Sequence, residues 1–226
     1  MNAKSCPCLI PAGFFLLACI TNLVARATAN TAVAAMVKPA LMPLVALTLV
    51  AAAGSMESKT IRLGVLALLL GCAGDIFLIA DGLPAFGCGL GCFLLGHIVY
   101  FMVFGSRSWK GIKPLVWAGV LAVMAAVVAG LLAVIGVKGG LLAPIFVYSM
   151  ALMLLIWCGL AGVIRLKGAT WWIVLFGGLL FTFSDSLIAI QMFGEKSALL
   201  EFLVMLTYMA AQCLLAWGAL RLSREG

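Results

Sequence analysis

Three ionisable side chains interrupt long apolar stretches of the sequence: Lys38, Asp75 and Asp185. An ionisable group at membrane depth costs several kcal/mol and marks a functional site by default. Lys38 can neutralise one carboxylate, and the second carboxyl then tends to keep its proton in a low dielectric. A protonated and an ionised carboxyl together suit acid–base catalysis. Asp75 and Asp185 are therefore the candidate catalytic residues. A salt bridge that only pins helices together would explain Lys38 and one aspartate, but not the other.

Further polar residues lie in the same apolar stretches and could bind a substrate or tune the carboxyl groups. With Lys38, these candidates are Asn22, His97, Tyr148, Ser184 and Tyr208. The ordinary alternative for each of them is a hydrogen bond between helices, and this is the favoured interpretation for His97. Ser184 adjoins Asp185, but neighbouring positions on a helix do not face each other, so we expect no serine nucleophile.

Several classes of site are disfavoured by the motifs of this chain. His97 is the only histidine, which argues against a zinc site built from several histidines. The sequence contains no phosphate-binding glycine loop, no dinucleotide fingerprint and no Gly-x-Ser-x-Gly elbow. We therefore expect chemistry without a metal or a cofactor.

The composition decides the solvent in which the chain folds. Apolar residues make up 66% of the sequence and charged residues only 9%, whereas soluble domains average roughly 45–50% and 25%. In lipid, only helices or closed barrels satisfy every backbone polar group. The apolar runs are long and unbroken rather than alternating, which favours helices. The net charge of +7 does not indicate a nucleic-acid partner, because most basic residues fall in short loops beside the runs.

The apolar runs predict an all-α membrane protein whose single domain, residues 1–226, is a bundle of eight transmembrane helices. The expected spans are about 8–25, 32–54, 61–80, 85–105, 114–136, 141–164, 170–193 and 198–221. Lys4 and the apolar stretch that ends at Cys19 resemble a lipoprotein-type signal peptide. However, the apolar run continues to Ala25, which favours an uncleaved transmembrane span. Gly87 and Gly91 form a small-xxx-small pair that predicts close helix packing.

The distribution of basic residues predicts an orientation with both termini in the cytoplasm. The cytoplasmic set is Lys4, Lys59, Arg62, Arg107, Lys110, Lys113, Arg165, Lys167, Arg221 and Arg224, and the outer set is Arg26, Lys138 and Lys196. From the helical rise, Asp75 and Asp185 lie about 21 and 22 Å from the cytoplasmic side, and Lys38 lies about 9 Å from the outer side. In a hydrocarbon core of about 30 Å, all three share one level in the outer half.

Motifs along the chain resemble those of the YhhN family of lysoplasmalogenases. They are Lys38-Pro39 with Met42-Pro43, Gly74-Asp75-Ile76-Phe77-Leu78, Phe86 with Gly89-Leu90, Phe93-Leu94-Leu95-Gly96-His97, Tyr100, Phe183-Ser184-Asp185-Ser186-Leu187, and the stretch from Tyr208 to Gln212. The resemblance implies an eight-helix membrane enzyme that hydrolyses the vinyl ether bond of lysoplasmalogens. The products would be a fatty aldehyde and glycerophosphocholine or glycerophosphoethanolamine. Related lysolipids are further candidate substrates.

The two candidate aspartates suit vinyl ether hydrolysis. Protonation of the β-carbon gives an oxocarbenium ion, which a carboxylate stabilises while water captures it, much as in glycosidases. Lys38 would keep one aspartate ionised or bind the lipid phosphate, and Tyr208 would relay a proton or orient water. The expected partners are a lysophospholipid from the bilayer and membrane lipids, in a bacterial inner (cell) membrane. A proton-coupled transporter or a lipid-binding membrane protein would use the same buried charges and is the alternative.

Overall fold

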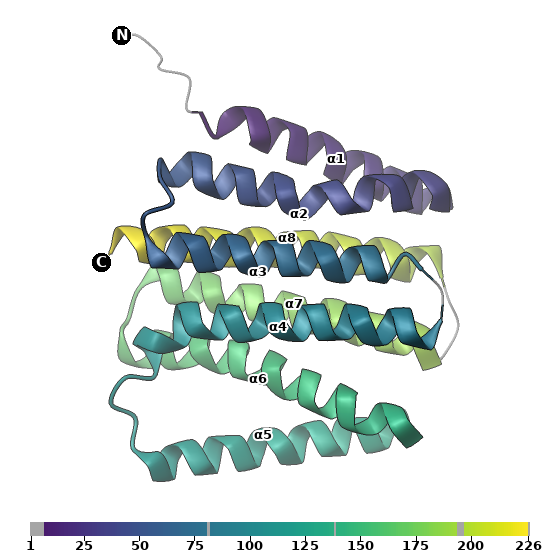
Figure 1. The fold of residues 1–226 in the computed structure, drawn as a ribbon. Coiled ribbons are helices and arrows are strands. Elements are labelled where there is room, and N and C mark those ends of the chain that lie inside the picture. Colours follow the sequence, from purple (N-terminus) through teal and green to yellow (C-terminus); the bar gives the residue numbers. More distant parts are fainter. Residues whose placement is uncertain (1–6, 81, 138, 194–196, 226) are drawn as a thin grey trace, which may run out of the picture.

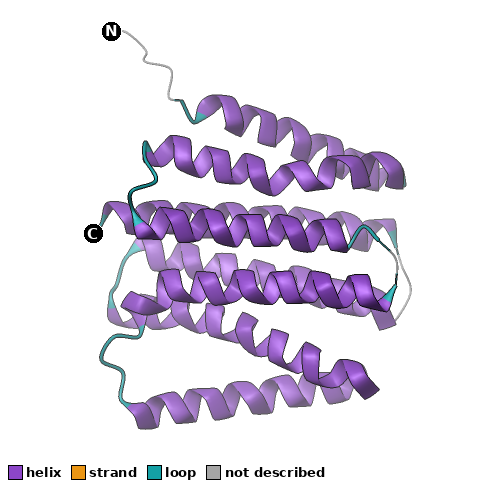
Figure 2. Cartoon of the chain, in the orientation of Figure 1, coloured by secondary structure: helices purple, strands orange, loops and turns teal. Residues whose placement is uncertain are grey.

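The computed structural model describes residues 7–80, 82–137, 139–193 and 197–225, and these residues form helices joined by short loops (Figure 2). The α-helices are α1 (Leu9–Ala27), α2 (Thr31–Ala53), α3 (Lys59–Phe77), α4 (Leu83–Ser108), α5 (Pro114–Ile135), α6 (Leu142–Arg165), α7 (Ala169–Phe193) and α8 (Ala198–Arg224). A short 3-10 helix, η1 (Gly139–Leu141), precedes α6. Each of the eight α-helices is long and apolar enough to cross a membrane. The predicted fold class is confirmed, and the protein is an integral membrane protein.

The helices agree with the predicted spans within a few residues. At the end of the bundle opposite the start of α1, the largest difference is in α3, which ends at Phe77 because Ile79 and Ala80 form turn hydrogen bonds to Ile76 and Phe77. The start of α1 and the end of α8 lie at the same end of the bundle (Figure 1). Which side of the membrane this end faces stays a prediction. Of the basic residues used for that prediction, Lys4, Lys138 and Lys196 lie outside the described residues.

The helices that carry the candidate residues pack around α8. This helix contacts α1, α2, α3 and α7, and α4 packs between α3 and α6. In contrast, α1 and α5 lie at opposite edges of the bundle (Figure 1), and α5 packs mainly against α6. The buried core is therefore built largely by α2, α3, α4, α6, α7 and α8. Lys38, Asp75 and Asp185 come from three of these central helices.

Two prolines inside α2 leave backbone acceptors that need other partners. Pro43 has no N–H to donate to the carbonyl of Pro39, one turn earlier. The thiol of Cys72 on α3 donates to this carbonyl instead, at 3.2 Å. In a membrane such a replacement is needed, because no bulk water can satisfy a freed carbonyl. The bond also ties α2 to α3 next to Lys38 and Asp75.

Glycines on α3 allow α4 and α8 to approach the helix that carries Asp75. A Cβ atom on Gly74 would lie 2.7 Å from Cε2 of Phe93, and one on Gly71 would lie 3.1 Å from Nε2 of Gln212. The predicted packing role of Gly87 and Gly91 is wrong, because a Cβ atom on either would meet nothing within 4 Å in the described part of the chain. These two residues point away from the neighbouring helices, and other glycines make the close contacts.

Replacing Gly74 with alanine is expected to destabilise the bundle by about 1–3 kcal/mol, because the added methyl group overlaps the Phe93 ring. Gly87→Ala is the matched control, because it adds the same group to a helix where there is room. Thermal unfolding in detergent should show a lower midpoint for Gly74→Ala and an unchanged or slightly higher one for Gly87→Ala. Equal midpoints would mean that Gly74 is not needed for this contact.

Candidate active site

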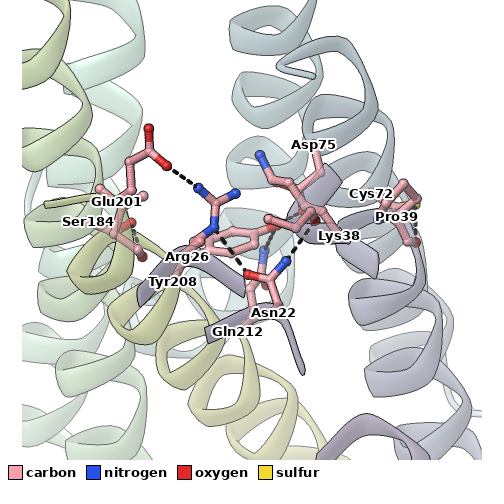
Figure 3. Close-up of polar contacts among 12 residues, drawn as sticks. Asn22, Arg26, Lys38, Pro39, Cys72, Asp75, Ser184, Glu201, Tyr208 and Gln212 are labelled. Carbon is pink, nitrogen blue, oxygen red and sulfur yellow. Dashed lines mark hydrogen bonds and ion pairs between the residues drawn. The ribbon is translucent and has the colours of Figure 1, made fainter. Parts of the chain in front are cut away.

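Asp75 is held by side chains from two neighbouring helices (Figure 3). Its Oδ1 lies 3.1 Å from Nζ of Lys38 on α2, and its Oδ2 accepts a 2.8 Å hydrogen bond from the hydroxyl of Tyr208 on α8. The Asp75 side chain is only 3% exposed. The structure therefore brings together three of the predicted residues, and the lysine has a carboxylate as its direct partner.

A chain of hydrogen bonds continues from Asp75 toward the other end of the bundle. Nε2 of Gln212 donates to the Tyr208 hydroxyl at 3.5 Å, and the Tyr100 hydroxyl donates to Oε1 of Gln212 at 2.7 Å. All these side chains are buried. The chain connects α2, α3, α4 and α8, so a change at Lys38 or Asp75 is expected to disturb packing well beyond the pair.

Asp185 on α7 has a different environment. Its Oδ2 accepts a hydrogen bond from the Tyr148 hydroxyl on α6, and no cation contacts it within the described residues. Its Oδ1 has no hydrogen-bond partner among those residues and is not fully enclosed. Asp185 is partly exposed and lines a pocket. The two aspartates therefore differ in both counter-charge and access.

Aromatic rings fill the space between the two aspartate clusters. The Phe181 ring lies 5.5 Å from the Tyr208 ring and 4.5 Å from the His97 ring, measured between centroids. His97 in turn lies 5.5 Å from the Tyr148 ring. The rings form a continuous path from the tyrosine that binds Asp75 to the tyrosine that binds Asp185. The aspartates share no hydrogen-bond partner in the described chain, so they form two separate polar clusters.

The structure corrects the expectation for His97. Its Nδ1 contacts the carbonyl of Phe93 on the same helix at 2.7 Å, and its Nε2 is buried without a partner among the described residues. Because a carbonyl only accepts, Nδ1 carries the proton. The predicted hydrogen bond between helices is therefore wrong. The ring is surrounded by the aromatic side chains of Tyr148 and Phe181, which leaves its own helix's carbonyl as the nearest acceptor.

Ser184 and Asn22 form hydrogen bonds between helices. The Ser184 hydroxyl donates to the carbonyl of Val204 on α8 at 3.0 Å and makes no hydrogen bond to Asp185. Asn22 donates through Nδ2 to the carbonyl of Ala34 on α2 at 2.9 Å. For both residues the structure therefore favours the ordinary alternative, although Asn22 has a further contact.

Arg26 is a residue that the sequence interpretation placed in an outer loop. Helix α1 continues to Ala27, so Arg26 lies in the helix, where its Nε donates to Oδ1 of Asn22 at 3.2 Å. Its Nη1 pairs with Oε2 of Glu201 on α8 at 3.1 Å. The spacing of four residues from Asn22 was the available signal, because residues at this spacing are neighbours on a helix.

Two adjoining pockets lie beside these charged groups. The apolar pocket is formed by α4, α5, α6 and α7 and includes Phe93, Leu132, Tyr148, Leu152 and Asp185. The polar pocket is lined by Arg26, Lys38 and Glu201 among apolar side chains. The two pockets share the wall residues Leu78, Phe86, Ile188 and Met192. Asp185 therefore faces the apolar pocket, whereas Lys38 faces the polar one.

The model of the YhhN family matches residues 33–219 of this chain. The chain belongs to the YhhN family. The resemblance seen in its motifs is thereby confirmed. The match includes Lys38, Asp75, His97, Tyr148, Asp185 and Tyr208. Asn22 and Arg26 precede the matched residues.

Curated relatives of this YhhN protein include three vertebrate proteins. Lysoplasmalogenase TMEM86B of Homo sapiens is 31% identical over 156 residues, which cover 69% of this chain and 62% of that protein. Lysoplasmalogenase TMEM86B of Sus scrofa is 32% identical over 66% of this chain and 60% of that protein. Lysoplasmalogenase TMEM86A of Bos taurus is 32% identical over 70% and 65%, respectively. The match thus spans less than two thirds of these relatives. No solved structure matches the chain.

The site of this YhhN protein offers two carboxyl groups with contrasting surroundings. Asp75 has a fixed cation and two occupied oxygens, so it is suited to carry a negative charge. Asp185 lines an apolar pocket, and within the described residues it has no cation nearby and one oxygen without a hydrogen-bond partner. Two chemically identical groups placed in different environments can take different roles in acid–base chemistry.

Proposed function

We propose that this protein hydrolyses the vinyl ether bond of a lysoplasmalogen or a related lysolipid. The products are a fatty aldehyde and a glycerophospho-headgroup. The observation that carries the proposal is the contrast between Asp75, which is paired with Lys38, and Asp185, which lines an apolar pocket without a cation nearby. The relatives named lysoplasmalogenase support the substrate class. The helical spans and the one-sided excess of basic residues support a location in a membrane with a defined orientation, and a bacterial inner (cell) membrane is the proposed one.

In the proposed reaction Asp185 is the general acid. An unpaired carboxylate is costly in apolar surroundings, so Asp185 keeps its proton in the resting protein. Tyr148 occupies Oδ2 and leaves Oδ1 to carry this proton toward the pocket. The proton passes to the β-carbon of the vinyl ether while the double bond shifts, which leaves an oxocarbenium ion at the adjacent carbon.

The second half of the reaction adds water. Water attacks the oxocarbenium carbon and gives one proton to the Asp185 carboxylate, which restores the acid. The resulting hemiacetal then collapses: its bond between carbon and the glycerol oxygen breaks, the aldehyde forms, and the proton of the hemiacetal hydroxyl passes to the glycerol oxygen. Asp75, kept ionised by Lys38, holds Tyr208 in place and stabilises the positive charge through space, across the aromatic rings that separate the two clusters. This sequence of steps consumes one water molecule and needs no other reactant.

Release of fatty aldehyde by the purified protein in detergent tests the proposal. Turnover is expected without any ion gradient, and the corresponding alkyl ether lysolipid, which lacks the double bond, should yield no aldehyde. Binding of lysoplasmalogen without aldehyde release would contradict the enzyme and favour the proton-coupled transporter. The assay thus separates the two classes of function that buried charges in a membrane bundle suggest.

The apolar pocket is the proposed site for the hydrocarbon chain. Ser149 lines it from α6, and Ser149→Phe should fill part of the space that a long chain occupies. We expect kcat/KM to fall about tenfold for long-chain substrates and much less for short-chain ones, because a few methylene groups decide fit in a closed pocket. Ser149→Ala is the control, since it removes the hydroxyl without filling space. An equal loss for both chain lengths would contradict this assignment of the pocket.

A further inference from the structure

The polar pocket contains two charged groups, Arg26 and Glu201, that the proposed reaction does not use. Arg26 comes from α1 and Glu201 from α8, and their side chains are 15% and 35% exposed. Lys38 on α2 lines the same pocket and is 11% exposed. Figure 3 shows Arg26 with Glu201 on one side and Lys38 with Asp75 on the other. Two cations and an accessible carboxylate therefore surround one space.

Each of these three groups has hydrogen-bonding capacity left. Arg26 uses Nε for Asn22 and Nη1 for Glu201, while its Nη2 has no partner among the described residues. The Lys38 ammonium has three N–H donors and a single partner, Asp75, in the same part of the chain. Glu201 uses Oε2 for Arg26, and its Oε1 is unpaired within the described ranges. The pocket thus offers donors to an anion and an acceptor to a cation.

We infer that the polar pocket is a headgroup site that selects a zwitterionic lysophospholipid, with phosphate at Arg26 and Lys38 and the ammonium group at Glu201. Guanidinium and ammonium groups are the usual partners of phosphate oxygens. The hydrogen bond that Arg26 donates through Nε to Asn22 fixes the Arg26 side chain in an orientation in which Nη2 has no partner among the described residues. This inference rests on the proposed function, because it names the part of the same substrate that remains outside the apolar pocket.

The shared wall of the two pockets supports the same arrangement. Phe86 and Met192, among others, line both the apolar and the polar pocket. A lysolipid with its chain in the first and its headgroup in the second would place the bond between chain and glycerol near this wall. Asp185 lines the first pocket and Lys38 the second. The ligand would therefore span from the proposed acid to the proposed phosphate site.

Glu201 gives the site its selectivity. Its carboxylate attracts an ammonium-bearing headgroup and repels one that ends in a doubly charged phosphate. We expect the protein to prefer alkenyl-glycerophosphoethanolamine over alkenyl-glycerol phosphate, measured as a ratio of kcat/KM values. Glu201→Gln keeps the shape of the side chain and removes its charge. It should reduce this ratio about tenfold, because the hydrogen bond from the ammonium group to a charged carboxylate is replaced by a weaker one to a neutral amide. Glu57→Gln is the control, because Glu57 is exposed in the loop between α2 and α3, and this loop lies at the end of the bundle opposite the start of α8 (Figure 1).

Arg26→Gln should raise KM for the ethanolamine substrate about tenfold and leave kcat close to wild type, because the phosphate contact serves binding. Arg62→Gln, at an exposed position near the start of α3, is the control. If Arg26→Gln does not fold, Arg26→Lys is the second variant. It keeps the positive charge but loses the planar guanidinium group with its paired N–H donors, so KM should rise by a smaller factor. If Arg26 and Glu201 only joined α1 to α8, these variants would melt earlier without changing the headgroup ratio, and the inference would fail.

Binding of 1-O-alkyl lysolipids, which cannot be hydrolysed, separates the inference from the proposed reaction. Headgroup-dependent binding that Glu201→Gln abolishes supports the headgroup site even if the protein releases no aldehyde. Turnover with a headgroup ratio that Glu201→Gln leaves unchanged overturns the site and spares the reaction. Inorganic phosphate and glycerophosphoethanolamine are further probes. At a concentration equal to that at which the lysolipid saturates the protein, neither probe should displace the bound lysolipid. If either probe displaced it as well as the lysolipid itself does, the pocket would be a site for soluble phosphates, and the inference would be overturned.

Discussion

Replacing Asp185 with asparagine is expected to lower kcat for aldehyde release by roughly 10²–10⁴-fold, the usual contribution of a general acid. Asparagine has nearly the same shape and can still accept the hydrogen bond from Tyr148, but it has no proton to give to a carbon atom. The substitution introduces no charge, so the protein should remain folded. Steady-state release of fatty aldehyde in detergent, with the thermal midpoint measured in parallel, checks the prediction.

Ser186→Ala provides the control for Asp185→Asn. Ser186 follows Asp185 on α7 and also lines the apolar pocket, but its hydroxyl donates to the carbonyl of Thr182 on its own helix at 2.8 Å. Its loss should change turnover little. If Asp185→Asn kept substantial turnover, Asp185 would not be the acid, and the assignment of roles to the two aspartates would have to be abandoned.

Breaking the ion pair between Lys38 and Asp75 should produce the largest change in stability. Lys38→Met leaves the Asp75 carboxylate buried without its cation, which costs about 3–5 kcal/mol for a pair of this kind. Asp75→Asn leaves the lysine unpaired and should also destabilise the bundle. The double variant Lys38→Met/Asp75→Asn removes both charges and should recover most of the lost stability. Thermal unfolding of all four proteins in the same detergent measures this difference.

Activity should respond to the same variants in a different way. The double variant is expected to be stable but inactive, because the charge that stabilises the oxocarbenium ion is gone. Asp75→Asn alone should also release little aldehyde. If the loss of stability in the double variant equalled the sum of the losses in the two single variants, the two charges would not be directly paired. Restored turnover in the stable double variant would restrict the pair to a structural role.

The sequence was sufficient to predict the eight helices and the buried charged residues. Apolar runs of membrane-spanning length leave the backbone no alternative to helix formation in lipid, and a charge in such a run stands out without any structure. Lys38 was expected either to keep one aspartate ionised or to bind the lipid phosphate. Which aspartate it meets depends on packing, since depth alone places Asp75 and Asp185 at one level. The structure pairs it with Asp75.

The contacts of Arg26 and the packing around His97 could not be predicted from the sequence, for related reasons. Arg26 lies one residue past its predicted span, and its long side chain reaches back to Asn22 and across to Glu201, 175 residues away in the chain. Within the described residues His97 makes no hydrogen bond to another helix, because the surrounding side chains from α6 and α7 are aromatic. Neither fact follows from helical periodicity, which says which residues share a face but not what that face meets.

By itself the sequence determined the solvent, the helices and the cost of the charges inside them, because these depend on local composition and on the backbone's need for hydrogen bonds in lipid. Only the tertiary structure decided the surroundings of each charge. It gave Asp75 a cation and a tyrosine, and it placed Asp185 at an apolar pocket with one oxygen unpaired by the described residues. The difference arises because a side chain's surroundings are supplied by helices distant in sequence, and their packing selects which groups meet.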